Sequence, residues 1–149
     1  MRKILLFLLI NFSAYSQSDK ITHIELSYRH SMQNFATSVK IESSYINKTE
    51  PVKLKACVGK KCRDTILSRE SLDKIYLAVI NIEPKNLVAG FEDGGDGAVT
   101  TIKFGSYPND ISYSLWGVYK DDPLFIPVDF LKAAQLILEA AKLKIEDIN

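Results

Sequence analysis

The two cysteines, Cys57 and Cys62, are the residues of this 149-residue chain whose type and spacing most directly predict chemistry. Four residues lie between them, enough for a hairpin loop or a tight turn, and such a pair in an exported chain is typical of a disulfide. A thioredoxin-like redox site would need two intervening residues, and a zinc site would need about four ligands. We predict a structural disulfide that fastens one local turn, with free thiols or redox and metal chemistry as alternatives.

A histidine and a glutamate, His23 and Glu25, have the spacing that places two side chains on the same face of a strand. Such a pair is able to act in general acid/base catalysis or as half of a metal site. His30 has the opposite parity, and the sequence contains no GxSxG, HExxH or Walker motif. The sequence therefore favours a non-enzymatic protein, and a hydrolase with a dispersed site around His23, Glu25 and an acidic turn remains the alternative.

The acidic turn is the segment Glu92-Asp93-Gly94-Gly95-Asp96-Gly97. Clustered carboxylates beside glycines are able to wrap a calcium ion, but the spacing argues against an EF-hand loop. With Gly97 at the glycine position of that loop, Gly94 falls on a ligand position and Lys103 falls where a bidentate glutamate belongs. We interpret the segment as a solvated turn, and we predict no metal and no cofactor.

Aromatic residues are concentrated between positions 104 and 125, and they form the best candidate for a binding surface. Tyrosine and tryptophan suit protein interfaces because they bury a large area and keep a polar group available. Core packing competes with this interpretation, because Tyr113 and Trp116 have opposite parity on one strand. The predicted binding residues are Tyr107, Tyr113, Trp116, Tyr119 and Phe125.

The loop Lys120 to Pro127 closes this aromatic region and has two interpretations. Two carboxylates precede an apolar segment bounded by prolines, which is the composition of a stiff recognition loop. Leu124, Phe125 and Ile126 would alternatively cap the core, with Pro127 starting the last helix. The second interpretation is the one we favour.

Period-two alternation predicts the strands that would carry these residues. Apolar residues alternate with polar ones from His23 to Arg29, from Phe35 to Tyr45 and from Val52 to Cys57, and residues 64–67 continue the third run as a return strand. Two further strands, Val99 to Tyr107 and Ile111 to Tyr119, flank a Pro-Asn-Asp turn and should pair as a hairpin.

Helical spacing predicts two helices. Leu72, Ile75, Tyr76 and Val79 form an apolar face after Ser68 or Ser71, either of which is a suitable N-cap, and Pro84 ends the pattern. The second helix runs from about Val128 to Ile145 and is apolar around most of its circumference, as a mostly buried helix is. The predicted fold is α+β: an antiparallel sheet of about five strands with two helices packed on one face, in the order βββαββα.

The amino terminus has the three parts of a secretory signal peptide. Arg2-Lys3 precede the apolar run Ile4 to Ile10, and small residues at Ala14 and Ser16 predict cleavage before Gln17. Residues 1–16 are thus the expected signal and residues 17–149 a single α+β domain without a membrane span. Loss of Arg2 and Lys3 leaves 17 basic and 18 acidic residues, a formal charge of −1, so no basic excess remains to bind nucleic acid.

Export, small size and the absence of catalytic motifs make the chain similar to periplasmic inhibitor, immunity or accessory proteins of Gram-negative bacteria. This resemblance implies a small binding protein, periplasmic or secreted, that acts on a protein partner outside the cytoplasm. A structural envelope component is a further alternative.

Overall fold

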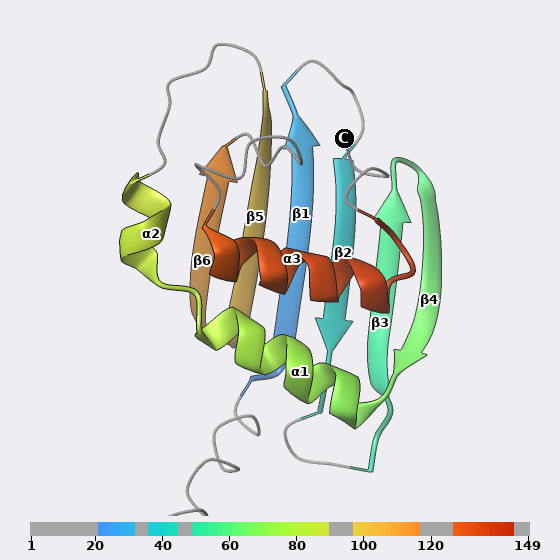
Figure 1. Ribbon diagram of the computed structural model, residues 1–149. Coiled ribbons are helices and arrows are strands. Elements are labelled where there is room, and N and C mark those ends of the chain that lie inside the picture. The colour runs from blue at the N-terminus through green and yellow to red at the C-terminus, as the bar shows by residue number, and fades with distance from the viewer. Residues whose placement is uncertain (1–20, 32–35, 45–48, 90–96, 117–126, 145–149) are drawn as a thin grey trace, which may run out of the picture.

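The computed structural model describes residues 21–31, 36–44, 49–89, 97–116 and 127–144, and six of its segments are strands of one antiparallel sheet. Along the sheet the strand order is β4-β3-β2-β1-β5-β6, so β4 and β6 form the two edges (Figure 1). The strands are β1 (His23–His30), β2 (Ala36–Glu42), β3 (Val52–Val58), β4 (Lys61–Leu67), β5 (Ala98–Ser106) and β6 (Asn109–Trp116).

Alternation of side chains gives the sheet one buried face and one open face. In β1, Ile24, Leu26 and Tyr28 are buried, and the pairing registers place Val39 of β2 and Ile102 of β5 beside Leu26 on the same face. These residues belong to a single apolar cluster that the helices complete. The residues of opposite parity form the open face, which is largely polar.

The helices α1 (Arg69–Ile80) and α3 (Val128–Ala140) cross one face of the sheet side by side (Figure 1). Ser68 caps α1, since its Oγ accepts a hydrogen bond of 3.1 Å from the amide of Ser71, as the sequence predicts. From α3, Phe130 and Ile137 are fully buried against the sheet. A short helix, α2 (Pro84–Ala89), lies beside β6.

The predicted α+β class with an antiparallel sheet is confirmed. The sheet has six strands rather than about five because residues 61–67 form a complete edge strand. The helix that was not predicted is α2, which begins at Pro84. This residue ends the periodicity of α1, and proline suits the first turn of a helix. The predicted signal peptide, Glu92 to Asp96 of the acidic turn, Tyr119 and the loop 120–126 with Phe125 lie outside the described residues.

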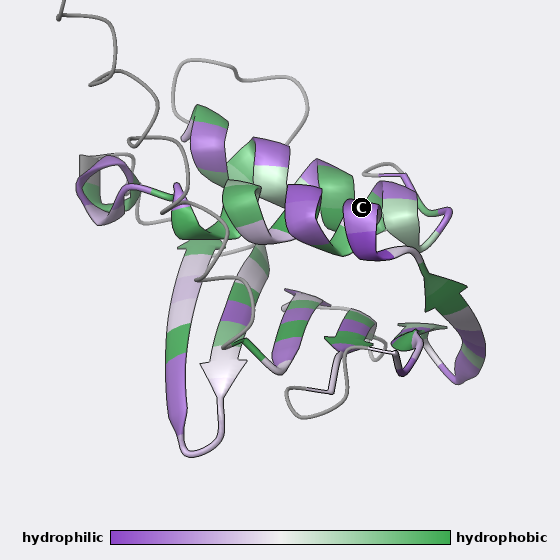
Figure 2. Cartoon of the chain, turned by 90° about the horizontal axis from the view of Figure 1, so that it is seen from below, coloured by the Kyte–Doolittle hydropathy of each residue, from purple (hydrophilic) through white to green (hydrophobic). Residues whose placement is uncertain are grey.

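The β5–β6 hairpin extends furthest from the helical layer. In the view along the strands, its turn lies well below the rest of the sheet, on the open side (Figure 2). Gly105 permits this tight turn, because a Cβ there would lie 2.2 Å from the carbonyl oxygen of Asn109 and 2.9 Å from Oδ1 of Asp110. The hairpin therefore holds its turn, Tyr107-Pro108, away from the core.

Candidate functional site

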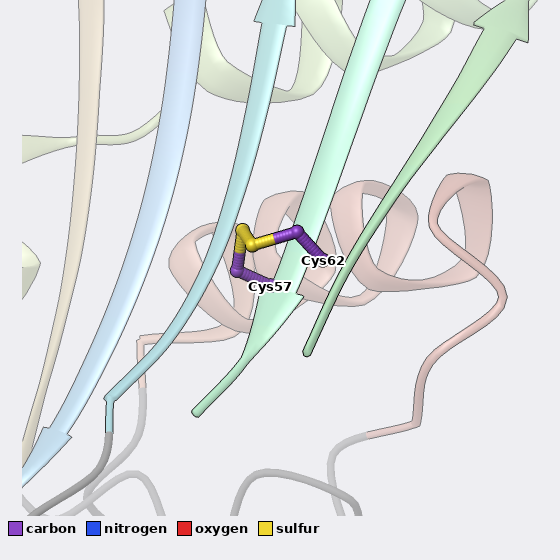
Figure 3. Close-up of a disulfide and its surroundings, with 2 residues drawn as sticks. All are labelled: Cys57 and Cys62. Atoms are coloured by element: carbon purple, nitrogen blue, oxygen red, sulfur yellow. A yellow bond between two sulfur atoms is a disulfide. The ribbon is translucent and has the colours of Figure 1, made fainter. Parts of the chain in front are cut away.

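The disulfide joins β3 and β4 at directly opposite positions. Cys57 and Cys62 are register partners, their Cα atoms are 4.1 Å apart, and the bond lies on the open face of the sheet (Figure 3). The turn between them contains Gly59, whose φ of 59° is the left-handed conformation that glycine adopts at little cost. The predicted Cys57–Cys62 disulfide is thus present, and it fastens the hairpin as expected.

The described aromatic residues of the predicted binding set do not form one surface. Tyr107 is 93% exposed in the hairpin turn, whereas Tyr113 is half-buried on the helical face, where its ring centroid lies 5.9 Å from that of Phe104. Trp116 lies on the opposite face from Tyr113, at the far end of β6 from Tyr107. Only Tyr107 of these three is free to contact a partner with its whole side chain.

Trp116 has a structural contact that explains its partial burial. A Cβ on Gly97 would lie 2.8 Å from Cε2 and Nε1 of the indole, so the Trp116 ring lies directly against the backbone of Gly97. The amide of Ser31 donates a 2.9 Å hydrogen bond to the carbonyl of Gly97. Trp116 therefore packs where the acidic turn enters β5.

A charged cluster on the open face links three strands. Asp110 of β6 accepts a hydrogen bond from Nε2 of His23 at 3.0 Å and another from Nζ of Lys103 at 2.7 Å. His23 reaches across β5 because its register partner there, Gly105, has no side chain. The hydrogen bond from Lys103, and secondarily the charges of Lys103 and His23, hold the pKa of Asp110 below its ordinary value.

A second ion pair lies beside this cluster, on β2. Nζ of Lys40 is 2.7 Å from Oε1 of Glu42. This hydrogen bond lowers the pKa of the Glu42 carboxyl and raises the pKa of the Lys40 ammonium. The open face thus carries paired charges over β1, β2, β5 and β6.

The structure places only part of the residue set of the hydrolase hypothesis, because the carboxylates of the acidic turn lie outside the described residues. His23 pairs with Asp110, and Gly97, at the end of the acidic turn, adjoins Ser31 beyond the other end of β1. Seven residue steps along a strand amount to about 23 Å, which is the distance between His23 and the end of β1 next to Gly97. In the described ranges, no group of three or more His, Cys, Asp and Glu side chains is arranged to hold a metal ion.

The β3–β4 hairpin has a charge opposite to that of the other residues from position 17 onward. Residues 52–67 have a formal charge of +4, and the other residues from position 17 onward, 12 basic and 17 acidic, sum to −5. The charged residues of the hairpin are Lys53, Lys55, Lys60, Lys61, Arg63 and Asp64. Arg63 points to the helical side, where its guanidinium donates a hydrogen bond to the carbonyl of Ala141.

The described surface includes the following two hollows. One, of about 650 Å³, is between α1 and α3 and is bordered by Leu77 and Lys132. The other, of about 550 Å³, lies over β2, β3 and β4 and is bordered by Lys40, Lys53, Lys55 and the exposed Ile66. The second hollow brings together apolar surface, lysines of the basic hairpin and the carboxylates of Glu42 and Asp64.

Comparisons with protein-family models, with curated proteins and with solved structures found no match to this chain. None of the helices in the described ranges combines the length and the apolar composition needed to cross a bilayer.

Proposed function

We propose that this chain is an exported, non-enzymatic binding protein of the inhibitor, immunity or accessory type, and that it acts on a protein partner in the periplasm or outside the cell. The observation that carries the proposal is the exposure of Tyr107 at 93% in the turn of a hairpin that extends away from the helical layer (Figure 2). A large aromatic side chain held in this way has few intramolecular contacts. It would contribute to the free energy of binding if a partner buried it.

Two further features support the proposal. Ile111, on the same hairpin, is 50% exposed, so the hairpin presents two large side chains to a partner. The disulfide belongs to the class of covalent bonds that persist in oxidising compartments, which fits a place of action outside the cytoplasm.

The test is capture of partners from the envelope and secreted fractions by the mature protein, with Tyr107→Ala as the variant. We expect this variant to weaken capture of the main partner by about tenfold, as truncation of a central interface tyrosine does. Val88→Ala on α2 is the matched control, because Val88 is 78% exposed but lies on another element. Equal capture by Tyr107→Ala and the unmodified protein would contradict a role for this hairpin.

A further inference from the structure

The edge strand β4 presents unsatisfied backbone groups in a defined pattern. The Cα separation of 4.1 Å at Cys57 and Cys62 is that of a non-hydrogen-bonded antiparallel pair. By alternation, Lys61, Arg63, Thr65 and Leu67 exchange hydrogen bonds with β3, and the amides and carbonyls of Cys62, Asp64 and Ile66 point away from the sheet. No described residue outside the β3–β4 ladder forms a backbone hydrogen bond with these three residues.

The two edges of the sheet differ in their surroundings. The helix α2 lies beside β6, whereas β4 is bordered by no other described helix or strand on its outer side (Figure 1). The outer side of β4 is thus open to another strand over its whole length in the described part of the chain, whereas α2 adjoins part of β6. A free edge of this kind pairs with an extended polypeptide segment through main-chain hydrogen bonds.

The side chains around β4 define the chemistry of such a segment. The hairpin keeps a formal charge of +4 with Asp64 counted, although Lys53 lies opposite Glu42 of β2 and Lys55 lies opposite Asp64 of β4. Ile66 is 71% exposed on the open face, beside the hollow that Lys53 and Lys55 border. A complementary segment would carry carboxylates, and an apolar side chain would lie against Ile66.

We propose that β4 accepts an extended acidic segment of a protein partner as an added strand. The outward groups of Cys62, Asp64 and Ile66 form the hydrogen bonds, the hairpin lysines attract the carboxylates, and the Cys57–Cys62 bond holds the two strands of the site together. The inference deepens the proposed function, on which it rests, because it names the chemistry of the partner.

Hydrogen exchange measured by NMR gives a direct test. The probe is an eight-residue peptide of glutamates alternating with valine or threonine, added to the mature, oxidised protein at up to about 1 mM, the concentration at which weak complexes form. We expect the amides of Cys62, Asp64 and Ile66, which exchange rapidly in the free protein, to slow by about tenfold. The same peptide with N-methylated amides, which has the same charge but no backbone donors, should give no protection.

Two pairs of variants separate backbone pairing from charge. Asp64→Pro removes an outward N–H without removing a bond to β3, and we expect it to weaken peptide binding by about tenfold, whereas Asp64→Ala should bind at least as tightly as the unmodified protein. The double variant Lys53→Ala/Lys55→Ala should weaken binding by about tenfold. The matched control is Lys74→Ala/Lys85→Ala, which removes two exposed lysines from the helices and should leave binding unchanged.

Three results would overturn the inference: no protection of these three amides, equal binding of the N-methylated peptide, or tighter binding of DNA or anionic vesicles than of the peptide. Protection that rises with protein concentration without peptide would assign the edge to a second copy of this chain and would also overturn it. If the lysine variants capture the envelope partner normally and Tyr107→Ala does not, the inference fails and the proposed function stands. If the lysine variants and Tyr107→Ala all capture the envelope partner normally, both the inference and the proposed function are contradicted.

Discussion

Asp110 shows how one residue of the open face depends on two other strands, its hairpin neighbour β5 and the more distant β1. It receives hydrogen bonds from His23 and Lys103, which lie 87 and 7 positions before it in the sequence. The bond from Lys103 is the larger cause of its lowered pKa. The carboxylate therefore stays ionised to a lower pH in the folded protein than in the unfolded chain.

This dependence predicts the effect of Lys103→Met. Removing the donor should raise the pKa of Asp110 toward its ordinary value, which an NMR titration of the side-chain carboxyl carbon would measure. Because the folded pKa lies below the unfolded one, the ionised group stabilises the fold above the unfolded pKa, and this contribution is lost as the pH falls through the folded pKa. Lys74→Met, which breaks the pair with Glu70, is the control and should leave Asp110 unchanged.

The sequence predicted the Cys57–Cys62 pair but not the His23–Asp110 pair. The cysteines are five positions apart, so a local turn suffices to join them. The pairing of His23 with Asp110 depends on the order β1-β5-β6 and on a glycine between them, which no local pattern in the sequence indicates. Parity correctly separates Tyr113 from Trp116, but the contact of Trp116 with Gly97 arises only where the acidic turn enters the sheet.

At the scale of elements, a strand was predictable from the sequence where one of its faces is buried, because burial produces an alternating apolar pattern. In the strands β1, β3 and β5, buried residues alternate with partly or fully exposed ones, and this periodicity is plain in the sequence. The edge strand β4 has charged and exposed residues over most of its length, so its pattern gives little signal before Leu67. The strand order was not predictable because the α1 and α2 connection carries the chain from one edge strand, β4, across the sheet to β5.

The β3–β4 hairpin should lose stability without its covalent bond. Removing a bridge that closes so short a ring, as in Cys57→Ala/Cys62→Ala, is expected to lower the free energy of unfolding by about 2 kcal/mol. Urea denaturation with and without dithiothreitol would measure this loss. Reductant should destabilise the unmodified protein to the level of the variant and should leave the variant unaffected; a reductant effect on the variant would locate the loss elsewhere.

At the scale of the whole molecule, the two faces of the sheet have different surroundings. The helices bury one face of the sheet, and the other face, the β5–β6 hairpin and the β4 edge remain available at different sides of the molecule (Figures 1 and 2). The β3–β4 hairpin is basic, while the other residues from position 17 onward have a net negative charge. An acidic partner would therefore be attracted to one side and repelled by others, which orients its approach.

For the chain as a whole, we predict export and cleavage of the signal peptide. We expect the exported protein to begin at Gln17, as amino-terminal sequencing would show, and Leu5→Arg/Leu8→Arg to retain the protein in the cytoplasm because the apolar run is interrupted. Val88→Arg, which places an arginine on the exposed surface of α2 and leaves the apolar run intact, should be exported normally. An exported product that retains Met1 would contradict cleavage.

The position of the two cysteines also determines how the protein acquires its covalent bond. A chain with two cysteines has a single intramolecular pairing, so oxidation yields no scrambled isomers and requires no isomerase to correct them. Closure of so short a segment takes about 10–100 ns, far less than the reaction with an oxidant, so encounter of the two thiols does not limit the rate. In an oxidising compartment the bond is able to form before β1 pairs with β5, and the β3–β4 hairpin then enters the remaining folding steps already joined.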